Sequence, residues 1–160
     1  MKRIAVVALT ALSLSACQEM LLGPAGPYNP APVSYGPATE RQVETASQRF
    51  AALMAAQDAN AIASAYAPDG VWERQSGPLR GRDAIRGALQ NNTGVRVLSF
   101  GMRTEYMSYN GPVVVHTGEF QQSVQLPNGK TSNNVGRFEA DWIRGPRGEW
   151  WIRRMAFRPK

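Results

Sequence analysis

Apolar positions recur at helical spacing near the start of the folded part of the chain. Between residues 40 and 56 they follow one face of a helix: Val43, Ala46, Phe50, Leu53 and Met54. Spacing of three to four residues is typical of an amphipathic helix, so this pattern predicts a helix over residues 40–56. Thr39 followed three residues later by Gln42 predicts a capping box at its start.

Two shorter helices and a strand are predicted next. Asp58 or Asn60 can cap a second helix, which the Pro-Asp-Gly segment at 68–70 would stop. Residues 71–74 are typical of a strand. Residues 82–89 place their apolar side chains on one face and predict a third helix.

The last part of the chain alternates apolar and polar positions. It predicts four strands, over residues 95–109, 112–126, 131–144 and 149–158. Asn-Gly pairs and a Gly-Pro-Arg-Gly segment separate them, and such residues accept the positive φ of tight hairpin turns. Helices followed by a run of antiparallel hairpins predict an α+β fold.

The first 17 residues have a different character. Two basic residues precede an apolar run from Ile4 to Leu14, and small residues then lead to Cys17. The run is shorter than the roughly 20 residues that cross a bilayer, so it predicts a signal peptide over residues 1–16. The segment 14–17, Leu-Ser-Ala-Cys, resembles the bacterial lipobox, in which the cysteine carries lipid and becomes the first residue after cleavage.

Cys17 is the only cysteine, which excludes a disulfide within the chain and favours lipidation over a buried or chance thiol. Gln18 in place of aspartate implies sorting to the outer membrane, facing the periplasm. Residues 17–37 are rich in proline and glycine and predict an extended tether. One domain over residues 38–160 follows it.

The net charge of +6 includes Lys2 and Arg3, so cleavage of the signal peptide lowers it to +4. Basic residues cluster from Arg137 onward, where attraction to anionic lipid or polymer is expected. Nucleic acid is not expected as a partner, because a protein of the cell envelope seldom meets it. The sequence shows no cluster of metal ligands, and neither a metal nor a cofactor is expected.

The order of these segments resembles the nuclear transport factor 2-like superfamily, which includes SnoaL-like proteins and ketosteroid isomerases. The resemblance spans residues 40–158 and is carried by the segments 50–53, 66–72, 81–86, 138–142 and 148–152, together with Asp58 and Ile62. It implies a cone-shaped, cystatin-like roll, in which a strongly curved antiparallel sheet wraps the helices and leaves a pocket. It also implies homodimers that pair through the sheet.

Ketosteroid isomerases place three catalytic groups in that pocket, and the resemblance puts other residues at all three positions. Phe50 stands where they have a tyrosine, Arg74 where they have an aspartate base, and Ala140 where they have a protonated acid. Phenylalanine has no hydroxyl and a guanidinium cannot accept a proton. Steroid isomerisation by that route is therefore not expected.

Strand alternation predicts which side chains face the pocket if Arg74 does. The expected ligand-binding residues are Trp72, Arg74, His116, Phe120, Phe138 and Trp142. Gly118 would leave room for a ligand or permit a bulge. These residues predict an aromatic pocket for a small apolar or weakly acidic molecule.

His116 is the only histidine, and three roles are open to it: packing, ligand contact or acid–base catalysis. Arg74 can instead form an ion pair. Trp150 and Trp151 point to opposite faces of their strand, so one of them offers an outer docking surface.

Three functional hypotheses follow. The leading one is a membrane-tethered, noncatalytic domain that binds a small ligand or a protein partner. The alternatives are a small SnoaL-like lyase, isomerase or hydrolase that uses His116, and a structural subunit of an envelope complex with an apolar outer sheet.

Overall fold

A computed structural model describes residues 30, 33–91 and 94–160 of the chain. The predicted signal peptide, the Cys17 lipid site and most of the predicted tether lie outside this part. Within the described residues, no helix is both long and apolar enough to cross a membrane.

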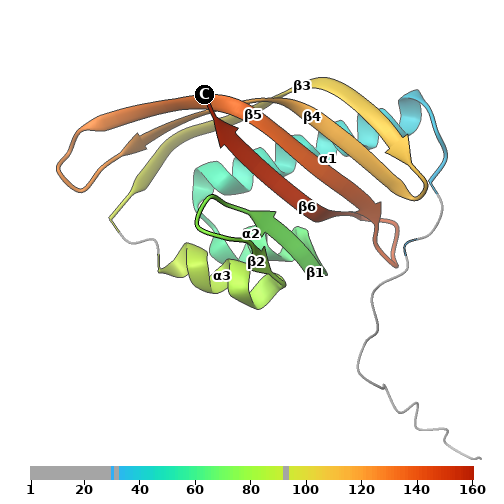
Figure 1. The fold of residues 1–160 in the computed structure, drawn as a ribbon, viewed down its shortest axis with the longest axis horizontal. Helices are drawn as coiled ribbons and strands as arrows, with labels where there is room; N and C mark the ends of the chain where they lie inside the picture. Colours follow the sequence, from blue (N-terminus) through green and yellow to red (C-terminus); the bar gives the residue numbers. More distant parts are fainter. Residues whose placement is uncertain (1–29, 31–32, 92–93) are drawn as a thin grey trace, which may run out of the picture.

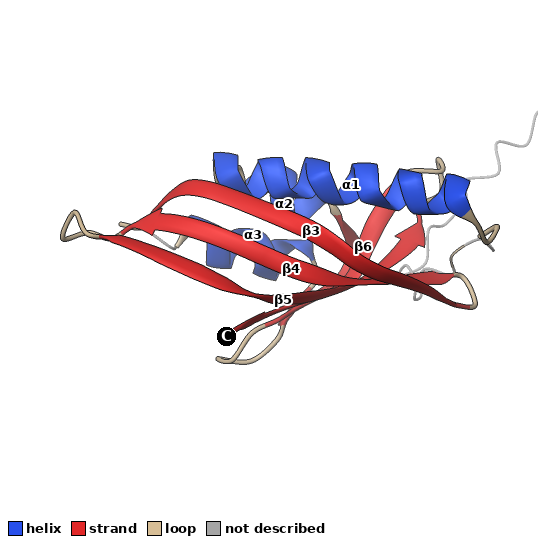
Figure 2. Cartoon of the chain, turned by 90° about the horizontal axis from the view of Figure 1, so that it is seen from above, coloured by secondary structure: helices blue, strands red, loops and turns tan. Residues whose placement is uncertain are grey.

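Three helices and six strands make up the described part of the domain (Figure 1). They are α1 Pro37–Ala56, α2 Ala59–Ser64, β1 Tyr66–Glu73, β2 Leu79–Arg80, α3 Arg82–Gln90, β3 Arg96–Asn110, β4 Val113–Gln125, β5 Thr131–Arg144 and β6 Trp150–Pro159. The strands form one curved, unclosed sheet in the order β2-β1-β6-β5-β4-β3. Helix α1 lies along one face of this sheet (Figure 2), which confirms the predicted α+β fold.

The start of α1 differs from the prediction. Gly36 occupies the N-cap with no side-chain cap, and the helix begins at Pro37, whose fixed φ suits the first helical position. The predicted capping box is wrong, because the Thr39 hydroxyl donates to the carbonyl of Ser34 at 2.6 Å instead. Tyr35 packs edge-on against Tyr109 of β3, with ring centroids 4.6 Å apart, so the chain that enters α1 is fixed to the sheet.

The segment after α2 also differs. Asp58 caps α2 as predicted, accepting from the Ala61 amide at 2.9 Å. The following strand begins at Tyr66, five residues earlier than expected, and pairs parallel with β6. Its register shifts between Tyr66 and Val71, so the Pro-Asp-Gly segment lies in an irregular stretch of β1 and does not end the helix.

The core lies between α1 and the inward side chains of the sheet. Helix α1 buries one face, which carries Val43, Ser47, Phe50, Ala51 and Met54. The sheet contributes the alternate residues that strand periodicity predicts: Val114, His116, Phe120, Phe138, Ala140 and Trp142 are all buried. The predicted inward face of the central strands is therefore confirmed.

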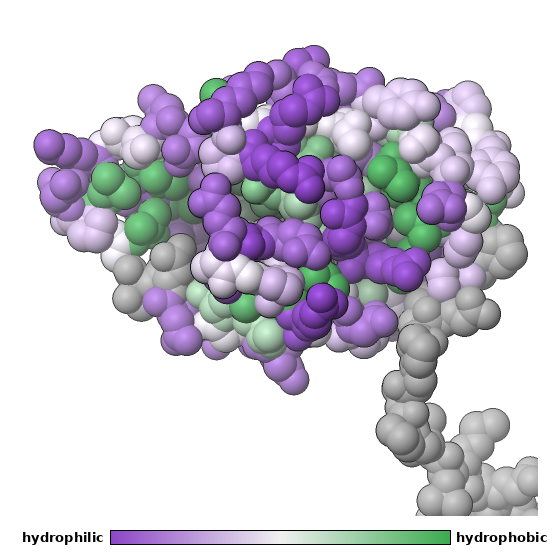
Figure 3. Space-filling model, in the orientation of Figure 1, coloured by the Kyte–Doolittle hydropathy of each residue, from purple (hydrophilic) through white to green (hydrophobic). Residues whose placement is uncertain are grey.

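The opposite face of the sheet is charged. Arg154 pairs with Glu139 and Asp141, Arg137 lies 2.5 Å from Glu105, and Lys160 lies 2.9 Å from Glu119. Figure 3 shows mainly hydrophilic residues across this face. Beside these ion pairs the same face carries a smaller apolar cluster that includes Val113, Val115, Ile143 and Trp151, so it is not apolar throughout, as the hypothesis of a structural subunit expected.

The paired tryptophans lie on opposite faces, as predicted. Trp150 faces the side of α1, and its indole N–H lies 3.4 Å from Gln42 Oε1. Trp151 lies on the outer face, half-buried beside Ile143 and with the Arg82 guanidinium 5.0 Å from its ring. Because Arg82 covers this ring, Trp151 does not form an open docking surface.

Candidate ligand-binding site

A cavity of about 600 Å³ opens at the end of the sheet where α1 finishes, and we call it the mouth cavity. Three phenylalanines from three strands form its aromatic wall: Phe100, Phe120 and Phe157. Their ring centroids lie 5.1 to 6.2 Å apart, within the range of favourable ring contacts. Such a wall suits a flat apolar molecule.

Gln57 holds the edge of this cavity. It is the C-cap of α1 and adopts a left-handed conformation with φ of 55°. Its side-chain amide donates to the Val95 carbonyl at 3.0 Å and accepts from the Val97 amide at 2.9 Å. These bonds join the end of α1 to the start of β3, so the wall of the cavity is fixed from both sides.

Two charged residues line the mouth cavity, Glu73 and Arg74. Strand β1 ends at Glu73, so Arg74 lies just beyond the sheet and is exposed at the rim. The prediction that Arg74 shares an inward strand face with Trp72 needs this correction. Among the described residues, the Arg74 guanidinium has no hydrogen-bond or ion-pair partner.

Three of the six predicted ligand-binding residues line the mouth cavity: Trp72, Arg74 and Phe120. The other three do not. His116 and Phe138 are packed together in the core, with ring centroids 4.8 Å apart, because α1 covers this part of the sheet. Trp142 lines a different cavity near the start of α1.

Gly118 allows β4 to lie close to β3, because a side chain at this position would clash with its neighbours. An added Cβ would lie 2.7 Å from the Phe138 ring and 2.0 Å from the Arg103 carbonyl oxygen. The ladder between β3 and β4 shifts register opposite this point, between Thr104 and Tyr106. Of the two expectations for Gly118, the bulge is therefore confirmed, and the space above the glycine is filled by Phe138.

A chain of polar groups connects α1 to His116. The Thr104 hydroxyl donates to Glu44 of α1 and lies 2.9 Å from His116 Nε2. A carboxylate can only accept, so the hydroxyl proton points to Glu44 and Nε2–H donates to Thr104. The Nδ1 atom then keeps a buried lone pair without a partner among the described residues.

The sequence did not reveal the role of Glu44, because this contact joins a helix to a strand that is distant along the chain. Glu44 reaches Thr104 from the helix, 60 residues earlier in the chain. In the sequence, Glu44 follows Val43 and so lies beside the buried face of the predicted helix, and this position was the one indication that it could reach the sheet.

Burial lowers the pKa of His116 to about 4, although the nearby Glu44 carboxylate acts in the opposite direction. In the unfolded chain the pKa of a histidine is about 6.5. Between pH 4 and pH 6.5, His116 therefore binds a proton more readily in the unfolded chain than in the native state. The stability that comes from a neutral His116 is present above pH 6.5 and is lost as the pH falls toward 4.

We expect this effect to cost about 3 kcal/mol of unfolding free energy at pH 4. Urea unfolding at pH 7 and pH 4 should show it, with His116→Gln as the comparison because glutamine can donate to Thr104 and does not titrate. The wild-type chain should lose about 3 kcal/mol more than the variant. An equal loss in both chains would show that His116 is not held neutral.

The family model for the SnoaL-like domain matches residues 47–145, which is more than half of the chain. The chain belongs to the SnoaL-like family. No curated protein sequence matches it, so the remaining comparisons of this SnoaL-like chain are structural.

Solved structures of low sequence identity share the fold. A ketosteroid isomerase-like protein from Erwinia carotovora atroseptica has a TM-score of 0.67 at 12% identity, covering 74% of this chain and 94% of its own. A nuclear transport factor 2-like superfamily protein from Salmonella enterica has a TM-score of 0.65 at 14% identity, covering 76% and 91%. A protein from Catenulispora acidiphila, solved in complex with S-DNPA, has a TM-score of 0.64 at 16% identity, covering 75% and 93%.

The three positions that the resemblance matched to isomerase catalytic groups do not share one cavity in the described part of this SnoaL-like domain. Phe50 and Ala140 are buried in the core, and Arg74 lies at the rim of the mouth cavity. The Tyr66 ring packs edge-on against Phe50 at 5.9 Å, but Tyr66 is fully buried and does not line the mouth cavity. Burial raises the pKa of its hydroxyl far above the usual range, so it does not ionise.

Proposed function

We propose that this SnoaL-like domain binds a small apolar or weakly acidic molecule in the mouth cavity and does not transform it. The observation that carries the proposal is the composition of the cavity: three packed phenylalanines beside the unpaired guanidinium of Arg74. An apolar body would contact the rings, and an acidic group would reach the rim.

The charges at the rim restrict the ligand further. Glu73 lines the same cavity as Arg74, so the two side chains together carry no net charge. A dianion would gain from Arg74 and be repelled by Glu73. A neutral molecule or a monoanion with a flat apolar body fits this arrangement better.

The noncatalytic part of the proposal is supported by what the isomerase positions contain. Phe50 and Ala140 cannot donate or accept a proton through their side chains, and Arg74 cannot act as a base. His116, which the rival enzyme hypothesis requires, is fully buried and does not line the mouth cavity. A ligand in that cavity would therefore not meet its imidazole.

We also propose that a lipid on Cys17 holds the domain at the outer membrane, with the predicted tether as spacer. Support comes from the resemblance to the lipobox and from the place where the chain joins the domain. Residues 33–36 meet the sheet beside Tyr109, at the start of α1, whereas the mouth cavity lies at the end of α1. A helix of 20 residues spans about 30 Å, so the cavity would open away from the tether.

Replacing Arg74 by glutamine should weaken the binding of a flat monoanion about fivefold. A hydrogen-bonded charge at a partly exposed rim is expected to contribute about 1 kcal/mol. Calorimetric titration of the full-length chain with 2-naphthoate would measure this effect. Arg80→Gln is a matched control, because Arg80 is an exposed arginine of β2 that does not line the cavity.

The neutral analogue 2-naphthylmethanol separates the charge from the apolar contacts. It should bind the wild-type chain and Arg74→Gln equally. If 2-naphthoate does not bind, or binds Arg74→Gln as tightly as the wild-type chain, the proposed role of the mouth cavity and its arginine is wrong.

A further inference from the structure

Two side-chain amides that line the mouth cavity lie next to each other on adjacent strands, and we call them the amide pair. Gln122 of β4 and Asn134 of β5 are directly opposite in the ladder between these strands. Both share the inward face of their strands with Phe120 and Phe138. Opposite residues on one face of a sheet have Cβ atoms about 5 Å apart, so one small group can reach both amides.

The amide pair is not used by the fold. Among the described residues, neither Gln122 nor Asn134 has a side-chain hydrogen bond, and no hydrogen bond joins the two. Both residues are half-buried. Their donors and acceptors therefore face the cavity.

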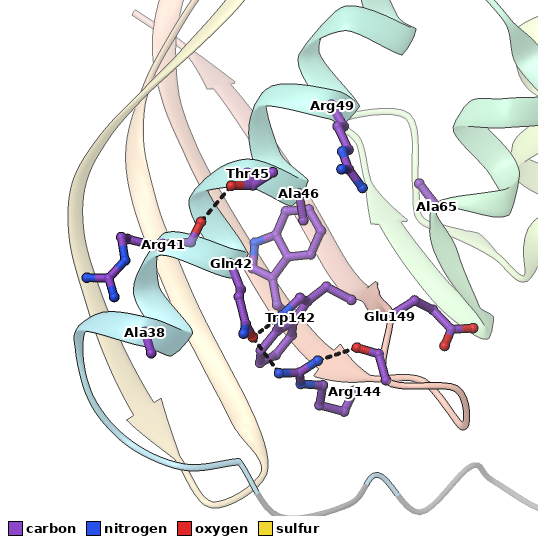
Figure 4. A pocket seen from close by; sticks show the side chains of 12 residues that line it. Ala38, Arg41, Gln42, Thr45, Ala46, Arg49, Ala65, Trp142, Arg144 and Glu149 are labelled. Carbon is purple, nitrogen blue, oxygen red and sulfur yellow. Dashed lines mark hydrogen bonds between the residues drawn. The ribbon is translucent and has the colours of Figure 1, made fainter.

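Two other glutamines that line cavities do have such partners. In the mouth cavity, Gln57 uses both polar atoms of its amide to join α1 to β3. A second cavity, of about 610 Å³, lies near the start of α1, and we call it the α1 cavity (Figure 4). There Gln42 Oε1 accepts from Arg144, as Figure 4 shows, and lies 3.4 Å from the Trp150 indole nitrogen. The amide pair differs from these structural amides and is available to a ligand.

The amide pair continues the aromatic wall of the mouth cavity. Phe100 of β3 lies opposite Gln122, so Phe100, Gln122 and Asn134 form one row across three strands. The Phe120 ring lies over Gly136, where an added Cβ would come 2.7 Å from it. A flat molecule against these phenylalanines would place one edge beside the amide pair.

The chemistry of the amide pair indicates what that edge should carry. A side-chain amide has an oxygen that accepts hydrogen bonds and an NH2 group that donates them. Two neighbouring amides can therefore offer one acceptor and one donor to the same ligand edge. A lactam or a primary carboxamide has the matching groups, an N–H donor next to a carbonyl acceptor. A carboxylate can only accept, so it would use the donors of the pair and none of its acceptors.

We propose that the amide pair selects, for the mouth cavity, ligands that carry a lactam or carboxamide edge on a flat apolar body. This inference rests on the proposed function, because it concerns the same cavity. A site that hydrogen-bonds a polar edge of its ligand rejects analogues without that edge, because its own polar groups then lose their partners. Such a ligand is neutral, which agrees with the balanced charges of Glu73 and Arg74 at the rim.

Titration of the full-length chain with 2-quinolinone, followed by nuclear magnetic resonance, tests this proposal. This flat bicyclic lactam carries its N–H and its carbonyl on one edge. The side-chain NH2 signals of Gln122 and Asn134 are assigned by their loss in Gln122→Met and Asn134→Leu, and both should shift saturably. Each substitution should raise the dissociation constant about fivefold, because it removes one hydrogen bond at a partly exposed position.

The chain supplies matched controls, because an exposed amide of the same type precedes each member of the pair. Gln121 and Asn133 lie on the opposite face of the sheet and do not line the mouth cavity. Gln121→Met and Asn133→Leu should leave the dissociation constant unchanged.

A second ligand tests the proposal without any substitution in the protein. The analogue 1-methyl-2-quinolinone keeps the carbonyl and lacks the N–H donor. It should bind the wild-type chain about fivefold more weakly than 2-quinolinone. This comparison does not depend on how well a variant folds.

Three results would overturn the role of the amide pair: no binding of 2-quinolinone, equal binding of the two quinolinones, or unchanged binding in both Gln122→Met and Asn134→Leu. A parallel titration with 2-naphthoate separates this failure from failure of the proposed function. If 2-naphthoate still shifts the indole signal of Trp72, which lines the mouth cavity, only the inference about the amide pair is wrong. If neither 2-quinolinone nor 2-naphthoate binds, the proposed function is wrong as well.

Discussion

Replacing Gly118 by alanine is expected to remove about 3 kcal/mol or more of unfolding free energy. The added Cβ would lie 2.0 Å from the Arg103 carbonyl oxygen, which belongs to the paired strand and cannot rotate away. Forcing an extra carbon into a packed region costs about 1–3 kcal/mol, and a backbone clash belongs at the upper end of this range. The melting temperature should fall by about 10 °C.

Gly101→Ala is the matched control, because Gly101 lies in the same sheet. There the added Cβ would lie 3.5 Å from the flexible side chain of Gln121, an ordinary contact. Alanine also restricts the unfolded chain more than glycine does, so stability should be unchanged or slightly higher. If both variants melt within about 2 °C of the wild-type chain, the close pairing of β3 and β4 at Gly118 is wrong.

Replacing Cys17 by serine should abolish attachment to the membrane. Serine offers no thiol for acylation, and each buried methylene of an acyl chain contributes about 0.8 kcal/mol to anchoring. Labelled palmitate should enter the wild-type chain and not Cys17→Ser, and the variant should move from the membrane fraction to the soluble fraction.

Ser13→Ala is the control for this experiment, because it changes the apolar run and leaves residues 14–17 intact. It should keep both the label and the membrane fraction. A wild-type chain that is exported without incorporating palmitate would contradict the proposed anchor.

Local patterns were sufficient to predict most elements of this fold. Strand β5 runs over residues 131–144 as predicted, because glycine-containing turns bound it on both sides and its side chains alternate as far as Trp142. The same alternation placed His116, Phe138 and Trp142 on the inward face. These features depend on a few neighbouring residues, which the sequence displays directly.

Features that depend on distant segments were not predictable in this way. The early start of β1 at Tyr66 follows from parallel pairing with β6, more than 80 residues later in the chain. The burial of His116 follows from the position of α1 over the sheet, and so does the contact of Glu44 with Thr104. Alternation shows which side chains face inward, but not which of them a helix will cover.

The packing of α1 on the sheet also divides the predicted ligand-binding residues between different places. Inward-facing residues were expected to line one pocket, yet α1 covers the middle of the sheet and leaves separate cavities near its two ends. Trp72 and Phe120 therefore line the mouth cavity, and Trp142 lines the α1 cavity. No pattern in the sequence marks where this division occurs.

The most direct test of ligand binding in the mouth cavity is the indole signal of Trp72 during a titration of the full-length chain with 2-naphthoate. Trp72 lines that cavity and is partly exposed, so a ring bound beside it would change its chemical shift. We predict a saturable shift whose midpoint moves to about fivefold higher concentration in Arg74→Gln. A Trp72 signal that stays in place at saturating 2-naphthoate would contradict the proposed function.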